Sequence, residues 1–264
     1  NRTIVWSLSN ARTASLSYAT VYPKKGGTPS TRQLTWADDQ GIDLAGFPLP
    51  ELVTYKAFDG LDIRALLYVP AGYTKGTPIP FIMSYHGGPE GQSRPFFTST
   101  MQYYLSRGYG VMMPNVRGST GYGRAFQMMD DYKKRWDSVR DGVDAAEWLV
   151  KNGYSEAGRI AAYGGSYGGF MSVGCVVEDQ ERVERGGRKD RLFGACVDIV
   201  GVVNLKTFLE KTSGYRRKLR EAEYGPLTDP EFLASVSSIH RVDKIKIPMF
   251  IAHGFNDPRV PVEE

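Results

Sequence analysis

Residues 163–170 read Tyr-Gly-Gly-Ser-Tyr-Gly-Gly-Phe, which is the pattern Gly-x-Ser-x-Gly centred on Ser166. One short apolar run precedes the pattern (159–163) and another follows it (170–177). This order predicts a strand, a sharp turn and a helix, the context in which such a serine forms a nucleophile elbow. Gly164 and Gly168 fit the turn because residues without a Cβ let the strand and helix approach closely. We therefore expect Ser166 to be an exposed nucleophile, and the alternative is a Gly-rich turn with an incidental serine.

A second motif lies upstream, where His86-Gly87-Gly88-Pro89 follows the strand-like run 80–85. A His-Gly-Gly segment after an inner strand is typical of an oxyanion hole, in which backbone N–H groups bind the developing negative charge. The second N–H comes from the residue after the nucleophile. We expect the amides of Gly88 and Tyr167 to form this hole; a strand-ending Gly-Gly-Pro turn is the alternative.

A third motif lies downstream, where the buried-strand run 249–252 leads into a loop that contains Asp257. An α/β hydrolase places its catalytic acid in a loop after a late strand. Asp257 is therefore the predicted acid, and an Asp-Pro turn former is the alternative. The three motifs occur in the order oxyanion loop, serine, aspartate, which favours a shared active site over three unrelated turns.

With these segments the chain resembles the catalytic half of the prolyl oligopeptidase family of serine peptidases. It looks most similar to the acylaminoacyl-peptidase and dipeptidyl-aminopeptidase-like members. The resemblance covers about residues 51–264. The segments that carry it are 58–63 (Phe-Asp-Gly-Leu-Asp-Ile), 86–89, 114–123 (Pro-Asn-Val-Arg-Gly-Ser-Thr-Gly-Tyr-Gly), 164–169, 224–225 and 253–261.

The middle of the chain alternates between strand and helix patterns. Residues 110–114 and 192–200 are strand-like, whereas apolar residues recur at helical spacing over 138–152. Strands separated by helices of this length predict a mostly parallel sheet with helices on both faces, which is an α/β-hydrolase fold. Ser166 then lies at the carboxyl end of the sheet, where such folds bind ligands.

The catalytic base is absent from the expected place. In α/β hydrolases the triad runs serine, aspartate, histidine, but the only histidines are His86, His240 and His253, all before Asp257. We expect each of them to be structural. The resemblance then implies that the base lies outside this chain, that the catalytic domain is incomplete at its C-terminus, and that this stretch alone is nearly inactive. It also implies an unpaired sheet edge, through which copies would associate, so a homo-oligomer is possible.

The N-terminal segment has a different character. Residues 3–9, 15–22 and 32–36 are strand-like, with a hairpin-type connection between the last two. Three strands are too few for an independent sheet domain. The family places a β-propeller before its hydrolase domain, and this segment resembles the last blade. We expect a propeller remnant and linker over 1–50 and the catalytic domain over 51–264.

Composition narrows the function further. The net charge of +4 gives no case for nucleic acid, and no apolar run approaches the roughly eighteen residues of a membrane span. Two cysteines, Cys175 and Cys196, fit reduced core residues, and no spacing indicates a metal or cofactor site. The charged stretch 178–191 is predicted to be an exposed helix end, and the basic stretch 206–220 a solvated helix face or the border of the cleft.

The expected function is therefore a serine peptidase that hydrolyses peptide or acyl-peptide bonds of short peptides, without a cofactor and with a cytoplasmic location favoured. The substrate-binding residues stay unassigned. Two alternatives remain open. One is a carboxylesterase of the same fold, and the other is an inert hydrolase-fold binding protein.

Overall fold

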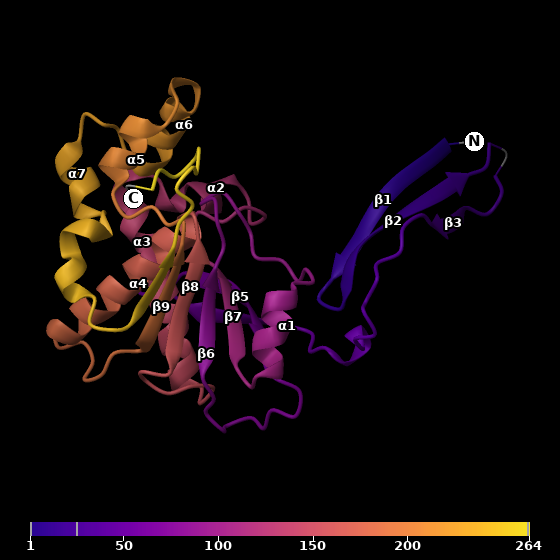
Figure 1. The fold of residues 1–264 in the computed structure, drawn as a ribbon, viewed down its shortest axis with the longest axis horizontal. Coiled ribbons are helices and arrows are strands. Elements are labelled where there is room, and N and C mark those ends of the chain that lie inside the picture. Colours follow the sequence, from indigo (N-terminus) through magenta and orange to yellow (C-terminus); the bar gives the residue numbers. More distant parts are fainter. Residues whose placement is uncertain (1, 25, 263) are drawn as a thin grey trace.

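The computed structural model describes residues 2–24, 26–262 and 264. They form two separate sheets, a small one at the N-terminus and a large one covered by helices (Figure 1). The extended chain between residues 34 and 50 joins the two sheets (Figure 1).

The small sheet is antiparallel, in the order β1-β2-β3. Its strands are β1 (Arg2–Asn10), β2 (Thr13–Tyr22) and β3 (Ser30–Gln33). The third strand is displaced from the sequence pattern. It runs from Ser30 to Gln33, whereas the pattern predicts a strand over 32–36. Beyond it, Ser17 N donates to the Thr35 side-chain hydroxyl at 2.8 Å instead of a backbone carbonyl, so the ladder stops there.

The large sheet has the order β10-β9-β8-β6-β7-β5-β4. Pairing is parallel from β10 across to β7, and β5 and β4 are antiparallel additions at the far edge. This is the mostly parallel α/β-hydrolase sheet that the sequence predicts. Its strands are β4 (Glu51–Lys56), β5 (Asp62–Tyr68), β6 (Phe81–Tyr85), β7 (Gly110–Asn115), β8 (Ile160–Gly165), β9 (Phe193–Ile199) and β10 (Met249–Ala252).

Helices cover both faces of this sheet. Helix α1 packs on β7 over one apolar cluster that includes Leu66, Ile82 and Val111, while α3 and α4 cover the larger core on the opposite face. The helices are α1 (Ser99–Ser106), α2 (Arg124–Gln127), α3 (Arg135–Lys151), α4 (Tyr167–Glu184), α5 (Leu205–Lys211), α6 (Gly214–Tyr224) and α7 (Pro230–Ser235). Short 3₁₀ helices are η1 (Leu44–Gly46), η2 (Met128–Asp130), η3 (Tyr132–Lys134) and η4 (Ser238–Lys244).

The small sheet contacts the hydrolase body through the turn between β1 and β2. Ala11 in this turn is buried against the α1 side of the large sheet, and its carbonyl accepts a hydrogen bond from Gln102 of α1 at 3.1 Å. The apolar side chains of β1 are exposed, among them Ile4, Val5 and Leu8. The hairpin tip thus packs on α1, while Ile4 and Leu8, which share one face of β1, stay exposed.

Both cysteines are free and buried, as the sequence predicts. Within the residues that the structure describes, none of the helices combines the length and apolar character that crossing a membrane requires.

Candidate active site

Ser166 occupies the junction between β8 and α4, at the carboxyl end of a central strand. Its backbone is in the left-handed region, with φ 58° and ψ −120°, which is a strained conformation for a residue with a side chain. A Cβ on Gly164 would overlap the Gly168 carbonyl, and one on Gly168 would overlap the Tyr85 carbonyl. Ser166 N donates to the Ile199 carbonyl of β9 at 2.9 Å, which fixes the turn to the neighbouring strand. The local geometry is that of a nucleophile elbow.

Tyr167 is the first residue of α4, so its N–H is one of the amides that has no acceptor within the helix. Its phenol points the other way, into the core, where it is only 1% exposed. The hydroxyl lies 2.9 Å from Ser138 Oγ and 3.2 Å from Asp130 Oδ2. The amide is therefore the group of Tyr167 that faces the strand's carboxyl end.

A buried charged network lies behind the Tyr167 ring. Arg135, fully buried at the start of α3, is ion-paired with Asp130 and donates to the Glu223 carbonyl at 2.7 Å. Glu223 Oε2 in turn accepts from Arg220 at 2.6 Å, and Arg220 also approaches the Gly88 carbonyl at 3.4 Å. Burial raises the pKa of Asp130 to about 6 and the pKa of Glu223 to about 7. The network connects the two residues that the sequence assigns to the oxyanion hole.

The loop after β6 lies against the elbow. A Cβ built on Gly87 would be 3.9 Å from the Ser166 Cβ. Gly88 has φ 137°, and a side chain there would overlap the backbone of Glu90, so the bend requires glycine. The structure thus brings the predicted oxyanion loop and the predicted nucleophile together.

The segment 115–123 holds this loop in place. Ser119 Oγ lies 2.8 Å from His86 Nε2, and Thr120 N donates to the Gly91 carbonyl at 2.8 Å. Asn115 bridges Ser93 and the Tyr122 hydroxyl. The Asn-x-Arg-Gly-Ser-x-Gly-Tyr-Gly motif therefore holds the predicted oxyanion loop through hydrogen bonds.

Arg117, in the middle of this motif, joins segments that are distant in sequence. It forms two hydrogen bonds with Asp59 at 2.9 and 3.1 Å, and two more from its side chain to Asp141 at 2.8 and 2.9 Å. Its guanidinium also lies 4.8 Å from the centre of the Phe58 ring. Fork-shaped pairing of this kind needs arginine, since lysine has no second parallel donor.

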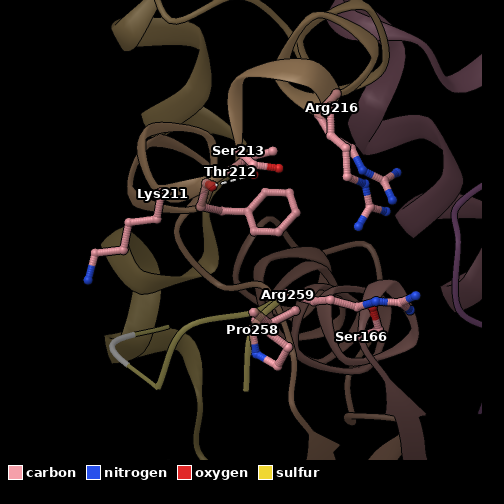
Figure 2. Close-up of a pocket in the computed structure, with 10 residues that line it drawn as sticks. Ser166, Lys211, Thr212, Ser213, Arg216, Pro258 and Arg259 are labelled. Atoms are coloured by element: carbon pink, nitrogen blue, oxygen red, sulfur yellow. Dashed lines mark hydrogen bonds between the residues drawn. The ribbon is translucent and has the colours of Figure 1, made fainter. Parts of the chain in front are cut away.

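Asp257 lies in the loop after β10, and its Oδ1 accepts from Arg259 N at 2.7 Å and Val260 N at 2.9 Å. These backbone hydrogen bonds, Val260 first, lower the pKa of the carboxyl group, which favours its ionised form. The next three residues, 258–260, line the same pocket as Ser166, and Figure 2 shows Arg259 running past Ser166. The structure therefore brings the loop of the predicted acid to Ser166.

The three histidines have other surroundings. His86 has both ring nitrogens engaged, one with the Gly87 carbonyl and one with Ser119, and burial lowers its pKa. His253 Nε2 donates to the Val260 carbonyl at 2.8 Å. His240 is exposed on η4, where the adjacent Arg241 pairs with Glu181 in the C-terminal half of α4, far along that helix from Ser166.

The far wall of the pocket is the part that the sequence left unassigned. It consists of residues from α5, α6 and the connection between them. The basic character of the stretch 206–220 was the sequence feature that indicated this wall. The full lining is Ser166, Phe208, Lys211, Thr212, Ser213, Arg216, Arg220, Pro258, Arg259 and Val260. No cluster of three metal-ligating side chains occurs within residues 2–24, 26–262 and 264.

Comparison with known proteins agrees with this geometry. The model of the prolyl oligopeptidase family matches residues 95–264, which is more than half of the chain. Dipeptidyl aminopeptidase BIII of Pseudoxanthomonas mexicana is 32% identical over 71% of this chain and 27% of its own length. The acylamino-acid-releasing enzyme of Sus scrofa is 28% identical over 82% of this chain and 29% of its own length.

A solved structure, a puromycin-hydrolyzing peptidase of Mycobacterium tuberculosis, superposes with a TM-score of 0.84 at 25% identity. The superposition covers 99% of this chain and 39% of that protein. The chain thus spans less than a third of the length of both curated relatives. It belongs to the prolyl oligopeptidase family.

Proposed function

We propose that this chain carries the nucleophile, the acid and the oxyanion donors of a serine peptidase that acts on short peptides. The observation that carries the proposal is one pocket lined by Ser166, in a strained left-handed turn at the end of β8, and by the three residues that follow Asp257. The family supports peptidase chemistry, and the names of the relatives include a dipeptidyl aminopeptidase and an acylamino-acid-releasing enzyme.

In this mechanism Ser166 Oγ attacks the substrate carbonyl carbon while a histidine accepts the hydroxyl proton. The amides of Gly88 and Tyr167 bind the oxyanion of the tetrahedral intermediate. The intermediate collapses, the C–N bond breaks, and the amine leaves with the proton from the histidine. Water then hydrolyses the acyl-enzyme by the same steps in reverse order, and Ser166 is restored.

We further propose that the base is none of the three histidines in this chain. His86 uses both ring nitrogens and His253 uses Nε2 on local partners, and His240 is exposed beside the far half of α4. Asp257 keeps Oδ2 without a hydrogen bond among the described residues, so this oxygen is available to orient an imidazole. The 264 residues alone should therefore have almost no peptidase activity.

The decisive experiment uses the full-length protein that contains this chain. Ser166→Ala should lower kcat on an aminoacyl arylamide by about 10⁵–10⁶, the scale of nucleophile loss in a serine protease. Retention of more than a tenth of the activity would refute the assignment. The 264-residue chain, assayed beside it, should be nearly inert, and comparable Ser166-dependent turnover would show that one of its own histidines is the base.

Two further assays of the full-length protein test the other candidate functions. A carboxylesterase would hydrolyse a short-chain aryl ester in preference to the arylamide, since its pocket would not hold a peptide. A binding protein of hydrolase fold would leave Ser166 unlabelled by a fluorophosphonate even in the full-length protein.

The division of the chain is part of the proposal. We assign residues 1–50 to a propeller remnant and linker, and residues 51–264 to the catalytic domain. The start of β4 at Glu51 and the separate sheet of β1–β3 support this boundary. Limited proteolysis should cut between residues 34 and 50 before it cuts within either sheet.

A further inference from the structure

The pocket beside Ser166 is electropositive. Four of its lining residues are basic, namely Lys211, Arg216, Arg220 and Arg259, and none is acidic. These four basic groups are not equally placed to bind a ligand in the pocket. Arg220 is ion-paired with Glu223 at 2.6 Å, and Figure 2 shows the Lys211 ammonium pointing away from the other lining residues.

Arg216 and Arg259 are the two basic groups best placed to bind a ligand. They reach the space from opposite sides, Arg216 from α6 and Arg259 from the loop after β10 (Figure 2). Neither has an ion pair among the residues that the structure describes, although Arg259 contributes to the lowered pKa of Asp257. Two guanidinium groups that face one small volume repel each other, and an anion placed between them would relieve that repulsion.

The remaining walls fit the stem of an acidic side chain. Phe208 and Val260 supply apolar surface, and both are largely buried. A glutamate side chain has two methylene groups for such walls and a carboxylate that arginine binds through paired hydrogen bonds. Because Ser166 itself lines the pocket, a side chain held there lies next to the attacked carbonyl, and we assign it to the residue that supplies this carbonyl.

We propose that this pocket selects peptides with an acidic side chain, preferentially glutamate, on the residue that supplies the attacked carbonyl. This inference rests on the proposed peptidase function. Charge-assisted hydrogen bonds of this kind correspond to a preference of roughly ten- to a hundredfold over an uncharged side chain of the same shape.

The test is a matched substrate series on the full-length protein. N-acetyl-Glu, N-acetyl-Gln and N-acetyl-Leu arylamides differ only in the side chain next to the cleaved bond. We expect kcat/KM for the Glu substrate to exceed that for the Gln substrate by at least about tenfold. Glutamine is the control for shape, because it differs from glutamate in charge and hardly in volume.

Substitutions then connect the preference to the pocket. Arg216→Gln should bring the Glu-to-Gln ratio toward one, and Arg216→Glu should reduce it below one while improving a Lys substrate relative to Gln. Lys218→Gln is the matched control, since it removes the same charge from the same helix at an exposed position outside the pocket. The ratio should survive that change.

The results distinguish failure of the acidic preference from failure of the proposed peptidase function. Turnover of the Gln and Leu substrates that depends on Ser166, with a Glu-to-Gln ratio near one, would overturn this inference and leave the peptidase standing. A ratio that falls as much in Lys218→Gln as in Arg216→Gln would also overturn it. No Ser166-dependent turnover of any member of the series would overturn the proposed function and this inference together.

Discussion

Ser166 and the three residues that follow Asp257 line one pocket, but the surroundings of Ser166 and Asp257 differ. Ser166 follows a central strand with a partner on each side, in a turn where close backbone contacts exclude any Cβ at Gly164 and Gly168. Asp257 follows β10, the edge strand, whose Phe250 and Ile251 are 62% and 63% exposed. Among the described residues, the carboxylate accepts hydrogen bonds from two amides of its own loop and from no neighbouring element.

The difference separates two ways of positioning a proposed catalytic group. On the serine side the conformation is imposed by the whole core, so structure and activity should fail together. On the acid side the geometry is local, so activity should fail while the fold survives. The predictions below test this contrast, in order of expected effect.

The largest effect should come from Asp257→Asn. The substitution keeps the side chain's shape but removes the charge that orients and stabilises an imidazolium, so kcat should fall by about 10⁴ in the full-length protein. The free energy of unfolding should change by no more than about 0.5 kcal/mol, as at other surface positions. Steady-state kinetics and thermal unfolding of one preparation measure both. A loss of kcat below tenfold would remove Asp257 from the triad.

Next is Arg135→Met. Arg135 is fully buried and paired with Asp130, so its removal leaves a buried carboxylate without its cation and should cost about 3–5 kcal/mol of stability. Lys151→Met at the other end of α3 is the control, because Lys151 is exposed and its pair with Glu147 contributes at most about 1 kcal/mol. Urea unfolding compares the two variants, and equal losses would contradict the role of the buried network.

A pair of glycines compares the two sides directly. In Gly164→Ala the new methyl group overlaps the Gly168 carbonyl, so stability should fall by about 1–3 kcal/mol and activity should fall with it. In Gly254→Ala the methyl group meets no atom within 4 Å, and stability should stay within about 0.5 kcal/mol of the parent. Chemical denaturation is the measurement. A tolerated Gly164→Ala would mean that the elbow is looser than its contacts indicate.

The smallest change in activity should come from Tyr167→Phe. The phenol points into the core, so kcat should be nearly preserved, while loss of its buried hydrogen bonds should cost roughly 1–2 kcal/mol of stability. Kinetics on the arylamide decide the point. A drop in kcat of about a hundredfold, the scale of a lost oxyanion donor, would make the hydroxyl the working group instead of the amide.

The sequence predicted the large sheet well because its strands are short apolar runs between helical patterns. The strand over 249–252 matches β10 residue for residue, and the helix expected over 138–152 is α3 displaced by a few residues. The Gly-x-Ser-x-Gly motif was equally informative about the turn between β8 and α4, since it encodes a local conformation. Local patterns are what a single sequence shows most directly.

Features that depend on distant contacts were less predictable. The stretch 178–191 has zero net charge and was expected to be exposed, but Glu178 and Asp179 are buried. Asp179 accepts hydrogen bonds from the amides of Leu192 and Phe193 and pairs with Arg188. Nothing in the local composition shows these partners. The Arg135 network and the pocket wall from α5 and α6 depend in the same way on tertiary packing.

The strand order also has a consequence for synthesis. The strands around Ser166, namely β6, β8 and β9, are all made before β10, and chains fold from the N-terminal side as they emerge. The sheet beneath the elbow can therefore close before Asp257 has left the ribosome. A serine without its base and acid is a poor nucleophile. The order of the strands thus delays assembly of the proposed catalytic centre until β10 and the loop of Asp257 have been made.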